Sequence, residues 1–332
     1  MNCVKERITS ARELAKLIGV SSATVSRAFS PNGRINEVTR VRVLAVAQQY
    51  GYQPNAIART LNNQRSRLVA VVVNVIANPC EAQHLELLVH QLQARALVPI
   101  VLCCGDITDR LQLMRLASTY QVDHAIIFSD LVPLKDAMQI FRTGRLIILS
   151  EESIEDTRVS SVCFEGVEGA SEIVDKLVGD GCKHFAYLCG RNSSWMDKQR
   201  RDWFSTALNR HGLTFEAEGH GDYSYDSGFK ESSLLLRRKK IDALVCGNDV
   251  MAIGARDAAV RLLGRQVPGD LAIVGQDGVA LAGWECNDLT TLALDQAAFI
   301  DAVMRLIERH EADDDSTGTA VIKFRARWGS TA

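Results

Sequence analysis

The segment Glu13-Leu-Ala-Lys-Leu-Ile-Gly-Val-Ser-Ser-Ala-Thr-Val-Ser-Arg27 decides the fold of the first part of the chain. Ser10 and Glu13 have the spacing of a capping box that opens a helix over 11–18, and Gly19 ends that helix. Ser21 can cap a second helix over 22–29. Two short helices joined by a tight turn with glycine are typical of a helix-turn-helix unit, although amphipathic helix pairs are also common in proteins that do not touch DNA.

A third helix is expected over 37–50, because Asn36 can cap its start and Gly51 can end it. Four apolar residues of this helix recur at three-to-four-residue spacing, which predicts that its buried face is formed by Val38, Val41, Leu44 and Ala45. The following segment 55–63 is helix-compatible but shorter than the ~12 to 15 residues that an isolated helix needs in water. We expect it to be poorly ordered without DNA or a partner.

Positive charge is concentrated at the beginning of the chain. The 332 residues include 38 Lys and Arg and 40 Asp and Glu, a net charge of -2. Residues 1–67 hold eleven basic and three acidic side chains, a net of +8, so the remainder carries -10. Because attraction to phosphates acts through local charge, this split predicts a basic head that seeks a polyanion, joined to an acidic globular body.

From Leu68 onward, short apolar runs alternate with helix-length segments, which is typical of parallel, doubly wound α/β sheets. Nine or so such runs exceed the usual ~5 or 6 strands of one sheet, so we expect two sheets with a ligand cleft between them. The expected strands cover residues 68–75, 98–103, 124–129, 146–149, 159–164, 185–189, 243–246, 271–275, 289–294 and 320–328.

The sequence lacks the signals that are typical of several protein classes. No apolar run approaches the ~18 residues of a membrane span, and the first residues do not form a secretory signal, so we expect a cytoplasmic protein without a membrane partner. The nine cysteines are odd in number and several lie in apolar runs, which favours free thiols. Cys-x-x-Cys and closely spaced His pairs are absent, as are Gly-x-Gly-x-x-Gly, Gly-Lys-Ser/Thr and Gly-x-Ser-x-Gly. We therefore expect no metal site, no cofactor and no enzymatic activity.

Several motifs in one order link the chain to a known family. The head contains the segment 13–27 together with Asn36-Glu-Val-Thr-Arg40 and Gly51-Tyr-Gln-Pro-Asn-Ala-Ile-Ala-Arg-Thr-Leu61. The body contains Cys246-Gly-Asn-Asp-Val-Met-Ala-Ile-Gly254, Val267-Pro-Gly-Asp-Leu-Ala-Ile-Val-Gly-Gln-Asp277 and Leu289-Thr-Thr291. Over nearly its whole length the chain thus closely resembles LacI/GalR-family bacterial transcription regulators.

The resemblance implies an all-α helix-turn-helix head and an α/β effector body of two doubly wound subdomains, similar to a periplasmic sugar-binding protein. The implied domains are a DNA-binding domain at 1–53, a hinge helix and linker at 54–67, and an effector-binding and dimerisation domain at 68–332. Within the body, the implied subdomains are approximately 68–163 with 295–318, and 164–294 with 319–328.

The function implied by the resemblance is a sequence-specific transcriptional regulator. Its simplest form is a homodimeric repressor that a sugar-like effector releases from a palindromic operator in double-stranded DNA. Two alternatives are left open, namely that the protein is a ligand-dependent activator or a corepressor-dependent regulator. The body alone also permits a solute-binding protein, but the missing secretory signal and the +8 head count against that class.

On the second helix we expect Ser22, Ala23 and Arg27 to face the major groove. The guanidinium of Arg27 matches the O6 and N7 acceptors of guanine, and a phosphate contact is the alternative. The hydroxyls of three residues at the start and on the side of this helix can contact phosphates or bond to backbone groups, namely those of Ser21, Thr24 and Ser26. By resemblance the segment 55–63 is a hinge helix that pairs in a dimer and pushes Leu61 into the minor groove. That helix contributes the remaining expected DNA contacts, Asn55, Ala58 and Arg59.

By resemblance the effector site is formed by Arg200, Tyr223, Asn248, Asp249 and Asp277. Carboxylates accept from hydroxyls, Arg and Asn donate, and an aromatic ring covers the apolar face of a sugar. A role as helix caps before Met251 is open for Asn248 and Asp249.

The chain departs from the family pattern at Asn74-Val75, Cys80-Glu81 and Ser150-Glu151, all expected in the first half of the cleft. The identity of a sugar therefore cannot be transferred. Acids such as Glu81 or Asp130, if they face the cleft, argue against a phosphorylated effector. Three tryptophans can equally stack on a ligand or lie buried, namely Trp195, Trp203 and Trp284.

Overall fold

A computed structural model describes residues 8–30, 33–54, 65–105, 109–130, 132–142, 144–191, 194–312 and 318–332. It divides into two compact units, Met1–Arg67 and Leu68–Ala332. Within the described ranges, no helix is long and apolar enough to cross a membrane. The described cysteines are free thiols, and five of them are buried.

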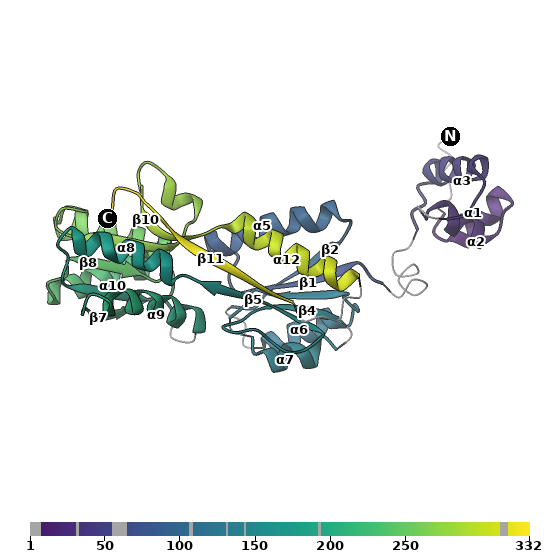
Figure 1. The fold of residues 1–332 in the computed structure, drawn as a ribbon. Helices are drawn as coiled ribbons and strands as arrows, with labels where there is room; N and C mark the ends of the chain where they lie inside the picture. Colours follow the sequence, from purple (N-terminus) through teal and green to yellow (C-terminus); the bar gives the residue numbers. More distant parts are fainter. Residues whose placement is uncertain are drawn as a thin grey trace, which may run out of the picture. The chain divides into compact units, whose positions relative to one another are not determined.

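The first unit contains the three predicted helices (Figure 1). Helix α1 (Ala11–Ile18) begins at Ser10, whose hydroxyl accepts a hydrogen bond from the Glu13 amide, and ends at Gly19 with φ 76°. Helix α2 (Ser22–Ala28) is capped by Ser21 and ends one residue earlier than predicted. Helix α3 (Glu37–Tyr50) lies between Asn36 and Gly51. The capping signals in the sequence therefore located the helix starts correctly.

The predicted buried face of α3 is wrong. Val38, Val41 and Leu44 are 77%, 58% and 39% exposed, and Ala45 is exposed as well. The core of the head is formed instead by Leu14, Ala15, Ile18, Val25, Ala28, Val43, Ala47 and Tyr52. Apolar residues occur on more than one side of α3, so the predicted face and the face with Val43 and Ala47 both have helical spacing. Packing against α1 and α2 decides which of the two faces is buried.

Two arginines of α3 fix the ends of the other helices. Arg40 donates from Nη1 to the carbonyls of Ala28 and Ser30, both at 3.0 Å, and from Nη2 to the carbonyl of Gly33 at 2.7 Å. Arg42 donates to the carbonyl of the last residue of α1 at 2.9 Å. The final carbonyls of a helix have no partner within it, so these guanidinium groups satisfy them and tie α3 to both helices.

The second unit is built on strands in the order β2-β1-β3-β4-β5-β11-β10-β9-β8-β6-β7. The strands β1 to β5 and the strands β6 to β10 each follow the same doubly wound parallel order, in which the second strand lies outside the first. The strands are β1 (Leu68–Val73), β2 (Val98–Cys103), β3 (His124–Ile127), β4 (Arg145–Leu149), β5 (Val159–Glu165), β6 (Phe185–Cys189), β7 (Phe215–His220), β8 (Ala243–Cys246), β9 (Ala272–Asp277), β10 (Thr290–Leu294) and β11 (Thr319–Arg327).

Helices cover the two halves of this sheet system (Figure 1). We call β1 to β5 with α5, α6, α7 and α12 the first lobe, and β6 to β10 with α8 to α11 the second lobe. The helices are α5 (Pro79–Ala94), α6 (Arg110–Ser118), α7 (Leu134–Ile140), α8 (Val167–Gly179), α9 (Trp195–Asn209), α10 (Tyr225–Arg238), α11 (Asp249–Asp257) and α12 (Gln296–Glu311). A π-helical turn, Ala258–Leu262, extends α11, and a 3-10 turn lies at Ala280–Gly283.

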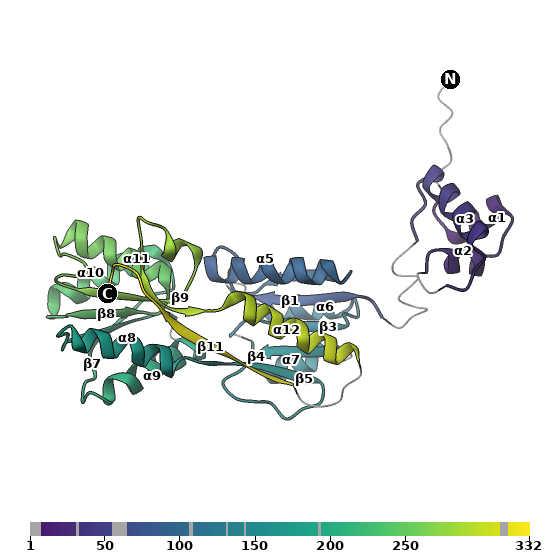
Figure 2. The ribbon, with the colours of Figure 1, turned by 45° about the horizontal axis from the view of Figure 1, so that its top comes forward.

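The chain passes between the lobes three times. It crosses after β5, returns between β10 and α12, and crosses again within β11. Strand β11 pairs parallel with β5 through Thr319–Lys323 and antiparallel with β10 through Phe324–Arg327. Figures 1 and 2 show this strand running from one lobe to the other. The lobes are thus joined by a shared strand rather than by a flexible linker.

Strand β7 has no counterpart among the predicted strands. Its side chains alternate between half-buried and exposed, and it includes Glu216 and Glu218. As the last strand in the order it is an edge strand, which has one neighbour and does not need a continuous apolar run. Its sequence therefore lacks the signal that marked the central strands.

Candidate functional site

A pocket lies between the two lobes at the carboxyl ends of their strands. In each lobe the strand order reverses beside the first strand, between β1 and β3 and between β6 and β8. The residues that follow these four strands meet at the pocket: Asn74 after β1, Asp130 after β3, Arg191 after β6 and Asn248 after β8. Doubly wound sheets bind ligands at such switch points, and here two of them face one cavity.

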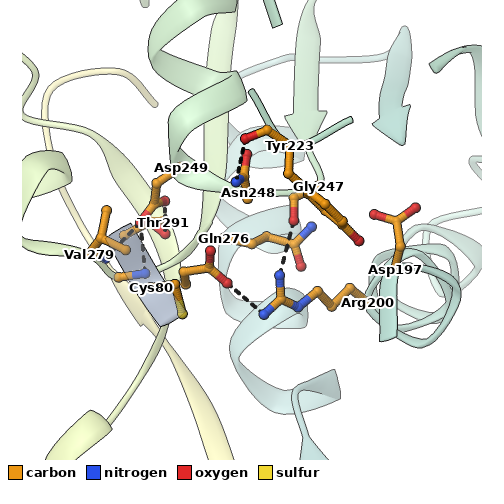
Figure 3. Close-up of polar contacts among 12 residues, drawn as sticks. Cys80, Asp197, Arg200, Tyr223, Gly247, Asn248, Asp249, Gln276, Val279 and Thr291 are labelled. Carbon is orange, nitrogen blue, oxygen red and sulfur yellow. Dashed lines mark hydrogen bonds and ion pairs between the residues drawn. The ribbon is translucent and has the colours of Figure 1, made fainter. Parts of the chain in front are cut away.

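Arg200 and Asp277 form a buried ion pair on the second-lobe wall. Arg200 Nη2 lies 2.6 Å from Asp277 Oδ1, and Nη1 donates to the carbonyl of Gly247 at 3.1 Å (Figure 3). The Arg200 Nε atom is buried and has no hydrogen-bond partner among the described residues. An unpaired donor on a buried cation costs free energy, so an incoming oxygen at this wall would stabilise the site.

Tyr223 and Asn248 complete the second-lobe wall. Asn248 caps α11 by accepting from the Met251 amide at 2.9 Å, and its Nδ2 donates to the Tyr223 carbonyl at 3.1 Å. Tyr223 has a φ of 72°, which this hydrogen bond helps to hold. A Cβ atom on Gly190 would stand 2.0 Å from the Tyr223 ring, so the ring's position requires glycine there. Figure 3 shows the ring extending toward Asp197.

Asp197 supports the wall from behind. Its Oδ1 accepts from the Gly190 amide at 3.0 Å, and its own amide donates to the Ser194 hydroxyl that caps α9. Burial raises the pKa of Asp197, and the Gly190 hydrogen bond opposes the rise. The carboxyl group therefore positions the loop after β6 and the start of α9.

Asp249 is not brought to the pocket with the other four residues expected at the effector site. Its Oδ2 accepts from the amides of Gly278 and Val279, both at 2.8 Å, and its Oδ1 accepts from the Thr291 hydroxyl at 2.5 Å (Figure 3). The side chain is fully buried, and burial with the neighbouring Asp277 raises its pKa. Asp249 thus fastens the turn after β9 to β10, while the cap before Met251, the alternative given for both residues, is formed by Asn248 alone.

The first-lobe wall is rich in carboxylate oxygens. Glu81 Oε2 accepts from the amides of Asn74 at 2.7 Å and Val75 at 3.0 Å. Asn74 Nδ2 donates to Asp130 Oδ1 at 2.8 Å, and Asn74 Oδ1 accepts from the Ser129 hydroxyl at 2.5 Å. Burial raises the pKa of Glu81 from 4.5 to about 7, with Asp130 adding to the rise. The two acids named in the sequence analysis thus both line the pocket.

Aromatic rings form the apolar part of the pocket. Phe299 lies 5.1 Å from Phe128, 5.7 Å from Phe164 and 4.8 Å from His84 between ring centroids, and Phe324 lies 5.7 Å from Phe164. Burial, followed by the charge of Arg200, lowers the pKa of His84 to about 3, so this ring is neutral. Phe164 of β5, Phe299 of α12 and Phe324 of β11 lie on or next to the segments that cross between the lobes, so these segments supply apolar rings to the pocket.

Four predicted residues line the pocket, namely Arg200, Tyr223, Asn248 and Asp277. Among the residues that the sequence analysis did not single out, Asn78, His84, Arg191, Ser194 and the phenylalanines also line it. Arg191 could have been found, because it lies two residues after the end of an apolar strand. No local sequence pattern marks the phenylalanines as pocket residues. Of the tryptophans, Trp195 lines a more open hollow beside the pocket, Trp203 is buried against Phe324, and Trp284 is 55% exposed.

Helix α2 presents a polar face in the first unit. Ser22, Ala23, Ser26 and Arg27 are exposed, and Arg27 Nε donates to the Ala23 carbonyl at 3.3 Å. Ser21 Oγ accepts from the Thr24 amide at 3.1 Å, so it caps the helix. The other expected DNA contacts lie outside the described residues, namely Asn55, Ala58, Arg59 and Leu61. In the part of the chain that the structure describes, no cluster of His, Cys, Asp and Glu could hold a metal ion.

Comparisons with known proteins match both parts of the chain. Residues 11–55 match the family model "Bacterial regulatory proteins, lacI family", and residues 174–327 match "Periplasmic binding protein-like domain". The HTH-type transcriptional repressor CytR of Escherichia coli (strain K12) is 26% identical over 297 residues, which cover 87% of this chain and 86% of that protein. The HTH-type transcriptional regulator DegA of Bacillus subtilis (strain 168) is 29% identical over 301 residues, 86% of each chain.

Among solved structures, the Lac repressor dimer bound to operator and the anti-inducer ONPF is similar with a TM-score of 0.85. The sequences are 22% identical, and the match covers 97% of this chain and 98% of that one. The fold of both units therefore agrees with the matched families. The chain thus combines a helix-turn-helix head of the lacI family of bacterial regulatory proteins with a periplasmic-binding-protein-like body, and the relatives that it matches over most of its length are HTH-type transcriptional regulators.

Proposed function

We propose that this chain is a homodimeric transcriptional repressor that a small polyhydroxylated, sugar-like effector releases from a near-palindromic operator. The observation that carries the proposal is the pocket, because two switch points on opposite lobes contribute polar side chains to one cavity. A ligand that bonds to both walls favours one relative position of the lobes over others. Binding energy spent in this way can shift an equilibrium between two conformations.

The proposed contacts follow the geometry of the pocket. Arg200 and Asp277 present a donor and an acceptor side by side, Asn248 adds an amide, and the neighbouring rings cover an apolar face. Such a set suits hydroxyl groups on a ring. We propose that the chain acts by binding in the cytoplasm and not by catalysis, and that the body divides into subdomains at 68–163 with 295–318, and at 164–294 with 319–328.

For DNA, we propose that α2 enters the major groove with Arg27 reading guanine and Ser22 and Ala23 beside it. The hydroxyls of Ser21, Thr24 and Ser26 would contact phosphates. The segment 55–63 would form a hinge helix that inserts Leu61 into the minor groove, with Asn55, Ala58 and Arg59 contributing contacts. This arrangement needs two heads, one for each half of the operator.

The proposed dimer face is the edge of the first lobe. Strand β2 is the first in the strand order, and both α5 and α6 pack against it. Large apolar side chains are exposed around this edge: Leu87 on α5, Val98 and Val101 on β2, and Leu116 and Tyr120 on or after α6. Several large exposed apolar side chains on neighbouring elements are typical of a protein–protein interface.

The test uses a duplex selected from random DNA by the full-length protein. Salt-sensitive retention of that duplex, with no turnover of the ligand, is the expected result. Coupling between two sites is reciprocal, so saturating operator must weaken effector binding by the same factor by which the effector weakens operator binding. Equal ligand affinity with and without operator would refute the mechanism, and tighter operator binding with ligand would indicate a corepressor-dependent regulator instead.

A further inference from the structure

Two carboxylates on the first-lobe wall have unused oxygens. We call Glu81, Asp130 and the Asn74 side chain between them the acceptor wall. The backbone amides of Asn74 and Val75 occupy Glu81 Oε2, and Asn74 Nδ2 occupies Asp130 Oδ1. Among the described residues, Glu81 Oε1 and Asp130 Oδ2 receive no hydrogen bond. Both residues line the pocket, so these oxygens are the acceptors that the wall can offer a ligand.

Donors on the surrounding elements do not match these acceptors. Asn74 Nδ2 is already engaged, and the ring of His84 is buried in the aromatic cluster. Arg200 is paired with Asp277 on the opposite wall. Arg191 also lines the pocket, but within the described ranges it forms no ion pair with Glu81 or Asp130 at up to 4.0 Å. Glu81 and Asp130 are half-buried at the pocket wall, so a ligand that excludes water from these two oxygens has to supply donors in its place.

We infer that the effector carries an amino nitrogen, as an amino sugar or an amino-bearing nucleoside does, and that this nitrogen donates to Glu81 and Asp130. Hydroxyls of the same ligand meet Arg200, Asn248 and Asp277 on the other wall. An amino group has at least two N–H bonds, which suits two acceptors on one wall. The inference rests on the proposed effector function of this pocket and names the chemistry of its ligand.

The same wall discriminates against anionic ligands. A phosphate oxygen placed between Glu81 and Asp130 would be repelled by the Asp130 carboxylate, and by Glu81 when that group is ionised, and would meet acceptors already engaged with Asn74 and Val75. A carbonyl oxygen there would also face acceptors. The ligand class is therefore defined by hydrogen-bond polarity at one end, while the aromatic rings and the second lobe recognise the rest.

Matched ligands test this polarity directly on the full-length protein. The probes are glucosamine, glucose and glucose 6-phosphate, then cytidine with uridine, and adenosine with inosine. Within each nucleoside pair an amino group replaces a carbonyl oxygen and the ribose is unchanged. We expect the amino member of at least one set to bind about tenfold or more tightly, since a hydrogen bond to a charged group contributes at least that factor. The set that responds distinguishes a sugar from a nucleoside.

Two isosteric variants give the mechanism its second test. In Glu81→Gln the amide oxygen can still accept from the two backbone N–H groups, while the free position becomes an NH2 donor. Affinity for the amino ligand should fall about tenfold, and affinity for its carbonyl counterpart should rise. Asp130→Asn should act in the same direction. Glu152→Gln is the matched control, because Glu152 is exposed and lines the more open hollow beside the pocket, together with Trp195, rather than the pocket itself.

Three outcomes would overturn the inference. These are equal or tighter binding of the hydroxyl, carbonyl or phosphate members, an unchanged ligand preference in Glu81→Gln, and no binding of any probe. In the first two cases, a ligand that still releases the selected duplex would leave the regulator function intact. Failure to select any duplex would instead count against the regulator function itself, so the two proposals fail in different experiments.

Discussion

The roles of Asp249 and Asp277 can be separated by replacing Asp249 with alanine. This change leaves the amides of Gly278 and Val279 and the Thr291 hydroxyl without their shared acceptor in a fully buried site. Each unsatisfied buried group costs about 1–3 kcal/mol, while removal of a buried carboxylate recovers part of its own desolvation. We expect a loss of about 3–6 kcal/mol in the free energy of unfolding.

Asparagine at the same position should largely restore stability. Its Oδ1 can accept from the two amides, and its NH2 can donate to Thr291 once that hydroxyl rotates. Burial and the neighbouring Asp277 raise the pKa of Asp249, which means that the site opposes a negative charge, so the neutral amide of asparagine avoids part of the desolvation cost. We expect Asp249→Asn to cost about 1 kcal/mol.

Thermal unfolding of the full chain measures both variants. For a unit of this size, 1 kcal/mol corresponds to about 2–4 °C, so Asp249→Ala should melt roughly 10 °C below the wild type. Asp249→Asn should melt within a few degrees of it and retain stabilisation by the effector. A wild-type Tm for Asp249→Ala would refute the structural role. Loss of effector stabilisation in a stable Asp249→Asn would place the carboxylate in the ligand site instead.

Three further changes address other parts of the molecule. Arg27→Ala should weaken binding to the selected duplex and reduce discrimination between its variants; equal losses on all sequences, measured by competition, would make Arg27 a phosphate contact. Leu116→Glu should shift the protein from dimer to monomer in analytical ultracentrifugation, since a charge would replace a side chain that is 58% exposed on the proposed face; an unchanged dimer would exclude that face. Glu81→Gln should be more stable than the wild type above pH 7 and lose this advantage toward pH 4.5. Burial, and to a smaller extent Asp130, raises the pKa of the Glu81 carboxyl to about 7 against the opposing charge of Arg191, so ionisation of Glu81 opposes folding. A pH-independent difference in Tm would contradict this.

The local signals in the sequence were sufficient for most elements. Cap residues located the starts of α1, α2 and α3, and apolar runs located the central strands. These signals succeed because each depends on neighbours within a few residues or on burial from both faces. The edge strand β7 lacked such a run, and the predicted strands 68–75 and 124–129 end earlier, at Val73 and Ile127. The first residue beyond each end, Asn74 and Phe128, lines the pocket.

The basic residues of the head illustrate the limit of charge counting. All eleven contribute to the net charge of +8 in residues 1–67. The structure shows that Arg40 and Arg42 also bind helix-end carbonyls of the head, while Arg27 lies on the exposed face of α2. A count cannot distinguish these roles, because they depend on which carbonyl lies within reach of each guanidinium group.

The sequence by itself determined the helix-turn-helix head, the alternation of strands and helices, and the family, since these follow from local propensity, apolar period and motif order. Tertiary structure alone decided which face of α3 is buried, that Asp249 holds a turn, and that Glu81 and Asp130 share a wall with Asn74. Residues from 73 to 324 reach one pocket because two strand-order reversals and three crossings bring distant segments together. Such convergence depends on contacts between residues far apart in the chain, which no short stretch of sequence encodes.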